Sequence, residues 1–239
     1  PPRSTQGVSS AASDVYKRQP LIKASKAPVR SKVYFIDIPG SKQSAITLGT
    51  LTIPGGNPEL YKLNVVNNRL GGGMEARLMR TLRLEKGYTY GAGSFFRENS
   101  YQTPFYAYSQ VRSNVTLESL EIFKNIINSY AKSYNSEDLD LTKNKLIKQN
   151  ALRFERLGSL IDMLDTMSKF NYPDTYIQNQ QDILTALTLE DAKNIAKSQF
   201  NADKMYFVVA GDAKTQLSRI KNLGYGNPIL LDREGNKIK

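Results

Sequence analysis

The stretch from Leu70 to Ser94 reads LGGGMEARLMRTLRLEKGYTYGAGS and is the most informative part of the 239-residue chain. The triplet Gly71, Gly72 and Gly73 predicts a turn, because glycine adopts backbone conformations that strain other residues. Residues 75–84 contain no helix breaker and predict one short helix, with two leucines four residues apart on one face. Gly87 ends this helix, and the following Tyr-Thr-Tyr-Gly predicts the start of a strand.

Two side chains of this stretch can donate hydrogen bonds to a peptide backbone. Arg83 near the helix end offers a planar fork of donors, and Tyr90 in the strand offers a hydroxyl. Because only a short glycine turn separates the helix from the strand, we expect these two groups to converge on one site. On spacing alone, an ion pair between Arg83 and Glu85 or Glu98 is the better interpretation.

The same stretch resembles the insulinase/pitrilysin family of zinc metallopeptidases, which includes the mitochondrial processing peptidases. It resembles specifically the second, non-catalytic domain, whose pattern is a glycine-rich turn, a helix with S/A-R-L, and then L-R-x-x-K-G-Y-x-Y. Here the pattern reads Gly71-Gly72-Gly73, Ala76-Arg77-Leu78, Leu82-Arg83 and Lys86-Gly87-Tyr88-Thr89-Tyr90. The resemblance implies that Arg83 and Tyr90 hold the substrate backbone and that the glycine turn lies near a chamber wall. We expect Arg77 and Lys86 to be a solvated helix end or an interface salt bridge.

The sequence contains no histidine and no cysteine. Active members of the family bind zinc through H-x-x-E-H on a helix, with a distant glutamate as third ligand. This chain cannot form that site, and no clustered acidic spacing suggests a zinc site made of carboxylates alone. We therefore expect no catalytic residue, metal ligand or cofactor in this chain. The resemblance implies zinc in a catalytic partner domain, either upstream in the same polypeptide or in a separate subunit.

The formal net charge of +11 is spread along the chain rather than gathered in one block. A generally basic surface explains it best, and the sequence shows no nucleic-acid-binding motif. Tyrosines at positions 88, 90, 101, 106 and 108 could stack on bases, but tyrosines that alternate along strands more often pack in a sheet. No run reaches the roughly 18 apolar residues of a membrane span. We therefore expect neither nucleic acid nor a membrane span, and the composition leaves the compartment open.

The chain divides into a short leader and one domain. Residues 1–19, PPRSTQGVSSAASDVYKRQ, lack a periodic apolar pattern and a secretory h-region. They resemble a translated sequencing adapter, and a disordered polar tail is the alternative. Residues 20–239 are expected to form a single domain that starts with a basic linker.

The apolar periodicities predict five strands and several blocks of helix. The expected strands cover residues 33–38, 44–53, 88–97, 104–112 and 204–210, and the last is expected at the centre of a sheet because it is strongly apolar. A helix at residues 136–157 is followed by Gly158 and then by a helix with Ile161, Leu164 and Met167 on its apolar face. Helices in long blocks favour an α+β fold, with a mostly antiparallel sheet packed on one face by helices.

These observations predict the non-catalytic, substrate-binding half of an insulinase-type zinc metalloendopeptidase. It would enclose a peptide chamber with a catalytic H-x-x-E-H domain, and its substrates would be peptides or small unfolded proteins. A structural or assembly subunit of the same fold, like the core proteins of respiratory complexes, is the alternative. A basic nucleic-acid-binding module is a third interpretation, supported by charge alone.

Overall fold

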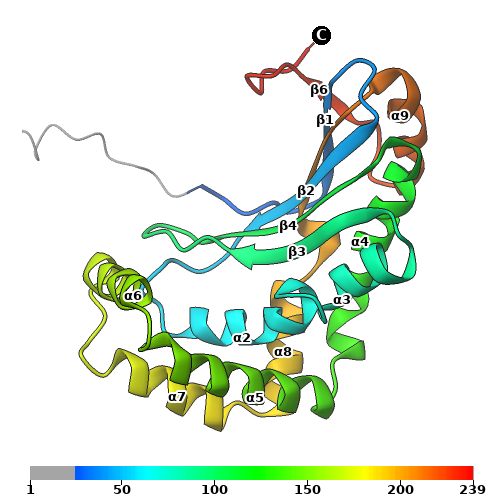
Figure 1. Ribbon diagram of the computed structural model, residues 1–239. Helices are drawn as coiled ribbons and strands as arrows, with labels where there is room; N and C mark the ends of the chain where they lie inside the picture. Colours follow the sequence, from blue (N-terminus) through cyan, green and yellow to red (C-terminus); the bar gives the residue numbers. More distant parts are fainter. Residues whose placement is uncertain (1–24, 239) are drawn as a thin grey trace, which may run out of the picture.

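A computed structural model describes residues 25–238, with the backbone alone at 151–153. The predicted leader, residues 1–19, lies outside the described residues. Figure 1 shows one twisted sheet with helices gathered on one of its faces. The strands of this sheet are β1 (Lys32–Asp37), β2 (Gln43–Leu51), β3 (Thr89–Phe96), β4 (Pro104–Arg112), β5 (Tyr206–Gly211) and β6 (Ile229–Leu231).

The sheet is mixed, with the strand order β3-β4-β2-β5-β1-β6. The pairings β3–β4, β4–β2 and β2–β5 are antiparallel, whereas β1 is parallel to both β5 and β6. The antiparallel pairings are in the majority, as predicted. The apolar strand expected at the centre is β5, which lies between β2 and β1 and is confirmed as an interior strand.

The helices follow the strands in the predicted long blocks. Their bounds are α2 (Glu59–Gly71), α3 (Arg77–Met79), α4 (Thr116–Ser133), α5 (Ser136–Arg153), α6 (Leu157–Phe170), α7 (Tyr176–Ala186), α8 (Leu189–Gln199) and α9 (Ala213–Ile220). A π-helix, η1 (Arg80–Glu85), continues α3 directly, and short 3-10 turns complete the chain. Among the described residues, no helix is both long and apolar enough to cross a membrane.

The hydrophobic core lies between one face of the sheet and helices α2, α4 and α8. On β4, Phe105, Ala107, Ser109 and Val111 are buried, and the residues between them face the other way. On α4, the regularly spaced Leu120, Phe123, Ile127 and Tyr130 are all fully buried against this face. Both elements behave as their periodicities predict, because one apolar side of each meets the same core.

Helix α6 departs from the prediction in two ways. It begins at Leu157, so Gly158 lies in its first turn, and the break after α5 falls at residues 154–156 instead. Its apolar residues are not in the core: the side chains of Leu157, Ile161 and Leu164 are 74%, 57% and 59% exposed. Figure 1 shows α6 at one end of the molecule, away from the sheet–helix core.

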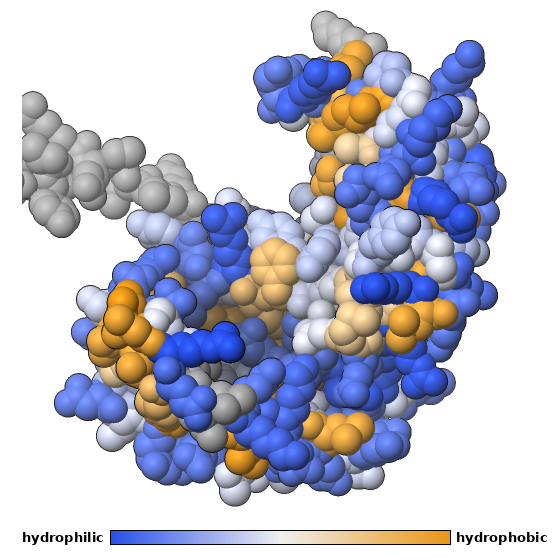
Figure 2. Space-filling model, viewed as in Figure 1, coloured by the Kyte–Doolittle hydropathy of each residue, from blue (hydrophilic) through white to orange (hydrophobic). Residues whose placement is uncertain are grey.

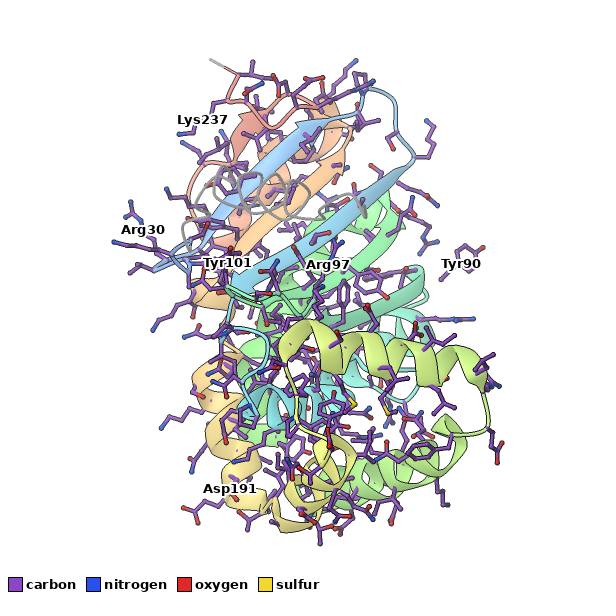
Figure 3. All side chains as sticks on the ribbon, turned by 90° about the vertical axis from the view of Figure 1, so that its left-hand side faces the viewer. Arg30, Tyr90, Arg97, Tyr101, Asp191 and Lys237 are labelled. Atoms are coloured by element: carbon purple, nitrogen blue, oxygen red, sulfur yellow. The ribbon has the colours of Figure 1, made fainter. Side chains whose placement is uncertain are left out.

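Within residues 25–238, no helix covers the second face of the sheet. Phe95, Tyr108 and Tyr206 project from this face and remain between 37% and 46% exposed. We call it the open face. Figure 2 shows the molecule hollowed between α6 and the arm that carries β1 and β6. Figure 3 looks into this hollow, and the open face is turned toward the reader above α6.

Candidate functional site

The glycine turn and the helix of the sequence motif form a tightly packed connection between α2 and β3. Gly71 is the last residue of α2, and a Cβ at this position would collide with the backbone of Ser94 in β3. Gly73 has φ +146, a conformation that side chains other than hydrogen disfavour. The Gly72 carbonyl accepts a hydrogen bond from Lys145 Nζ at 3.1 Å. The predicted turn is therefore present, but close approach to the sheet explains Gly71 rather than backbone freedom.

The helix predicted at residues 75–84 is shorter and wider than expected. Only Arg77–Met79 is α-helical, and the next turn, η1, is a π-helix that ends with a hydrogen bond from Lys86 N to Thr81 O. The chain then turns at Gly87, whose φ is +61, and enters β3. Single π turns are rare and occur often at functional sites, because the extra residue changes which way the side chains point.

Arg77 fastens this helix to the rest of the domain. Its Nη2 donates to Asp138 Oδ2 at 2.6 Å and to the Ser133 carbonyl at 2.9 Å, and its guanidinium lies 4.9 Å from the centre of the Tyr130 ring. Asp138 also accepts from Arg69 Nε at 3.1 Å. The carboxylate thus joins α2, α3 and α5, and Arg77 adds α4 through the Ser133 carbonyl. A solvated helix end was one expectation for Arg77, but an internal ion pair is its actual role, and no sequence pattern indicated Asp138 as the partner.

Arg83 is exposed on η1 and makes no ion pair among the described residues. Its guanidinium donates a weak hydrogen bond from Nη1 to Met74 Sδ at 3.8 Å. Glu85 pairs instead with Arg80 at 3.2 Å, and Glu98 accepts hydrogen bonds from Gly56 N and the Tyr172 hydroxyl. The structure therefore contradicts the ion-pair interpretation of Arg83 with either glutamate.

Tyr90 is the most exposed tyrosine of the motif, with 89% of its surface accessible. It lies within the bulge between Thr89 and Ala92 in the pairing of β3 with β4, and in Figure 3 it projects outward from the edge of the sheet. Tyr90 and Arg83 make no hydrogen bond or ring contact with each other among the described residues. Both are nevertheless free to meet a third group, because they leave the same short segment and neither is buried.

Other aromatic residues of the sequence divide between the core and the open face. Tyr88 packs against the core, whereas Tyr106 and Tyr108 lie on the open face beside Phe95, with ring centres 5.4 and 5.8 Å from the Phe95 ring. Figure 3 places Tyr101 and Arg97 between the sheet and α6. Both tyrosines therefore pack against Phe95, Tyr106 with a tilted ring and Tyr108 with a T-shaped contact, in the way expected of a half-buried sheet surface.

The residues of this chain do not fit a zinc site. The sequence lacks histidine and cysteine, and within residues 25–238 no three Asp or Glu residues lie where they could share a metal ion. The buried carboxylate of Asp138 is held by Arg69 and Arg77 instead.

The fold and the motif together define the class: an α+β domain of metallopeptidase type without a metal site of its own. The chain belongs to the peptidase M16 family. The family model described as "Peptidase M16 inactive domain" matches residues 8–146, which is more than half of the chain. This match confirms the resemblance to the non-catalytic domain of insulinase-type peptidases.

Relatives and solved structures agree with this assignment. The non-peptidase homolog YmxG of Helicobacter pylori is 23% identical over 159 residues, which cover 65% of this chain and 36% of that protein. A peptidase M16 inactive domain from Pseudomonas fluorescens superposes with a TM-score of 0.71 at 25% identity, over 87% of this chain and 52% of that one. A protease from Helicobacter pylori has the same fold, with a TM-score of 0.71, 16% identity and the same coverage. The chain thus spans about half or less of the length of these proteins.

Proposed function

We propose that this chain is the substrate-binding, non-catalytic half of an M16-type zinc metalloendopeptidase. It would enclose a peptide chamber together with a catalytic H-x-x-E-H domain, which would be upstream in the same polypeptide or in a separate subunit. The open face above the hollow would form part of the chamber wall. The partner would supply zinc, base and water, and this chain would bind and orient the peptide.

The observation that carries this proposal is the contrast between Arg83 and its neighbours. Of the four arginines between residues 69 and 83, Arg69 and Arg77 are bound to Asp138 and Arg80 is paired with Glu85. Arg83 alone lacks a carboxylate partner and is exposed. Its guanidinium can donate two hydrogen bonds to peptide carbonyl oxygens, and the free hydroxyl of Tyr90 can donate a third.

Peptide binding by the full chain tests the proposal directly. With a fluorescein-labelled unstructured peptide, we expect Arg83→Ala and Tyr90→Phe each to weaken binding about two- to tenfold, since a hydrogen bond at an exposed site contributes roughly 0.5–1.5 kcal/mol. Arg83→Lys should be nearly as harmful as Arg83→Ala, because lysine lacks the planar fork. Arg80→Ala is the matched control, since Arg80 lies one turn earlier but is paired with Glu85.

The same variants can be followed in turnover once a catalytic M16 domain from the same source is combined with the chain. Loss of turnover efficiency for Arg83→Ala, but not for Arg80→Ala, is the expected result. Folded Arg83→Ala and Tyr90→Phe proteins that bind peptide as tightly as the parent would refute the peptide-binding role.

The second candidate is a structural or assembly subunit of the same fold. It is favoured by the description of the Helicobacter pylori relative as a non-peptidase homolog. In that case Arg83 and Tyr90 would contribute nothing to activity, and the chain would act through the surfaces that contact its partner. Unchanged peptide binding in the Arg83 and Tyr90 variants, with normal assembly, would favour this candidate.

A further inference from the structure

A row of side chains crosses the open face at the level of Gly49. The strand register places Phe95 of β3, Tyr106 of β4, Gly49 of β2 and Tyr206 of β5 side by side, followed by Lys32 of β1. Gly49 has no side chain, so the row contains a gap between Tyr106 and Tyr206. We call this gap the tyrosine slot. The sequence contains one indication of this gap: Gly49 interrupts a strand that is otherwise rich in β-branched residues. A glycine inside a strand often marks a site where a ligand or another backbone approaches closely.

The two walls of the slot are supported from behind. The ring of Tyr106 lies 5.4 Å from that of Phe95, and the ring of Tyr206 packs edge-on against Tyr34, also at 5.4 Å. Each wall therefore has an aromatic neighbour on its outer side that opposes its collapse outward. Neither tyrosine reaches across the gap to the other, and the space between them forms part of a cavity of about 350 Å³.

The size of the slot suits one flat ring. Tyr106 and Tyr206 are two strands apart, so their backbones are roughly 10 Å from each other. A ring inserted between them needs about 3.5–4.0 Å on each side. Thr47 and Val208 line the slot on the sheet, and Pro28 and Lys26 of the segment before β1 line its other side. The lining is thus aromatic and aliphatic, with one ammonium group at its border.

The charge around the slot is positive. The six described strands contain a single acidic residue, Asp37, and its carboxylate accepts a hydrogen bond from Ala213 N at the start of α9. Lys32 ends the row beside Tyr206, and Lys26 lines the slot. A peptide with carboxylates next to the inserted ring would therefore meet cations and no anion from the strands.

We propose that the tyrosine slot is a side-chain pocket that binds one aromatic residue of an acidic peptide segment. This inference rests on the proposed function, because it assumes that a peptide occupies the hollow. It adds a second binding element to Arg83 and Tyr90: these hold the backbone, which is common to all peptides, and the slot selects a side chain.

The test compares the affinities of the full chain for three short fluorescein-labelled peptides. The first has a single Phe between glutamates. The Ala twin has Ala in place of Phe, and the lysine twin has lysines in place of the glutamates. We expect the parent protein to bind the Phe peptide at least about tenfold more tightly than the Ala twin, since burial of a phenyl ring contributes on that scale. The lysine twin should bind more weakly than the glutamate peptide, and this difference should shrink as salt is added.

The Gly49→Val substitution fills the slot from its floor. A Cβ at Gly49 would lie 3.4 Å from the Phe105 carbonyl oxygen and 3.6 Å from Cδ1 of the Tyr106 ring. These are contact distances, so the fold can accept a side chain there that packs against the Tyr106 wall, and valine suits a strand. We expect Gly49→Val to reduce the affinity for the Phe peptide to that for the Ala twin. Gly158→Val is the control, because a Cβ at Gly158 on α6 meets no atom within 4 Å. Tyr206→Ala provides a second, independent removal of the slot.

The outcomes separate the slot from the proposed function. Equal affinity of the parent for the Phe and Ala peptides, or a preference for Phe that survives both Gly49→Val and Tyr206→Ala, would overturn the slot while leaving backbone binding intact. Equal binding of the lysine twin would overturn the preference for acidic segments. Binding of none of the peptides would overturn the proposed function itself. Arg83→Ala should weaken the Phe and Ala peptides by the same factor, because it acts on the backbone.

Discussion

Tyr134, at the end of α4, buries a hydroxyl that forms no hydrogen bond of good geometry. The hydroxyl of Thr142 lies nearby and is also buried without a partner among the described residues. Burial raises the pKa of Tyr134 from 10.0 to about 12. A buried phenol without a partner costs desolvation energy that a phenyl ring does not. We therefore expect Tyr134→Phe to leave the free energy of unfolding at pH 7 unchanged or to increase it, by up to about 1 kcal/mol.

The same substitution should also change the response to alkaline pH. The raised pKa means that the folded state holds the proton of the Tyr134 hydroxyl more tightly than the unfolded state. The resulting contribution to the free energy of unfolding is complete below pH 10 and is lost as pH rises through 12. Tyr130, whose pKa is raised by burial as well, keeps some of this dependence in the variant. Urea unfolding at intervals from pH 7 to 11.5 should give a shallower decline for Tyr134→Phe than for the parent. Parallel declines would contradict the burial of an unpartnered hydroxyl.

The partner of Arg83 shows which residue-scale features a sequence can predict. The motif identified Arg83 and Tyr90, but spacing alone favoured an ion pair with Glu85, which instead binds Arg80 five positions earlier. In an α-helix, side chains three or four residues apart are neighbours, whereas the wider π turn brings positions five apart together. The sequence contains no simple pattern that predicts the π turn. The structure was therefore needed to show that Glu85 pairs with Arg80 and that Arg83 is exposed.

Among the elements, α3 and η1 depend on the ion pairs of Asp138. The Asp138 side chain is only 8% exposed, and it binds Arg69 and Arg77, which are 18% and 24% exposed. Removal of this carboxylate would leave the partly buried Arg77 without its counter-charge and Arg69 with only the exposed Glu75 at 3.5 Å, and the loss of a buried counter-charge commonly costs about 3 kcal/mol or more. We expect Asp138→Ala to lower the free energy of unfolding by that amount in urea titrations. Glu59→Ala, which breaks an exposed pair with Lys62, should cost less than about 1 kcal/mol.

Loss of Asp138 should also free the helix that carries Arg83. Hydrogen exchange of residues 77–86 should become faster in Asp138→Ala than in Glu59→Ala, because only the first variant loses the ion pairs that connect this helix to α2 and α5. Equal stability and equal exchange in the two variants would show that packing of Leu78 and Leu82, both fully buried, is sufficient to hold the helix.

Helices α6 and α4 both carry an apolar stripe, so one leucine from each can show how much burial of the stripe contributes to the free energy of unfolding. Leu164 is 59% exposed, whereas Leu120 on α4 is fully buried. Leu120→Ala should lower the free energy of unfolding by about 2–5 kcal/mol through the cavity it creates. Leu164→Ala should change it by no more than about 0.5 kcal/mol. Thermal or urea unfolding measures both, and a large loss for Leu164→Ala would mean that α6 packs on the domain more closely than its exposed side chains indicate.

Periodicity predicts elements well where the apolar stripe and the core coincide. The strands β2, β4 and β5 were predicted to within a few residues for this reason. In α6 the stripe of Ile161 and Leu164 has the same period but faces outward, because periodicity reports that one side of a helix is apolar and not what covers it. Likewise, the open face could not be predicted from alternation, since half-buried strands alternate whether or not a partner lies beyond them.

At the scale of the whole molecule, the described helices cover one side of the sheet, and no described helix packs on the other. The core holds α2, α4 and α8 against the first face, and the aromatic open face borders the hollow seen in Figure 2. Large exposed aromatic patches in proteins commonly mark binding surfaces. The chain also spans only 52% of the Pseudomonas fluorescens structure that it matches. Both facts agree with the proposal that a second M16 domain closes the hollow.

That proposal divides the labour of catalysis between two domains and leads to a prediction for the chain alone. Zinc hydrolases need ligands that hold the metal and leave one position for water, and histidine is the usual nitrogen ligand. This sequence has no histidine or cysteine, and the described carboxylates form no group that could replace them. We therefore expect the purified full chain to cleave neither casein nor short fluorogenic peptides, with or without added zinc. The measurement is the hydrolysis rate against a chelator-treated blank.

The complementary experiment adds a catalytic M16 domain that recognises the chain. Zinc-dependent cleavage should then occur, and Arg83→Ala in the chain should lower its rate. Chelator-sensitive hydrolysis that co-purifies with the chain alone, at constant specific activity, would refute this division.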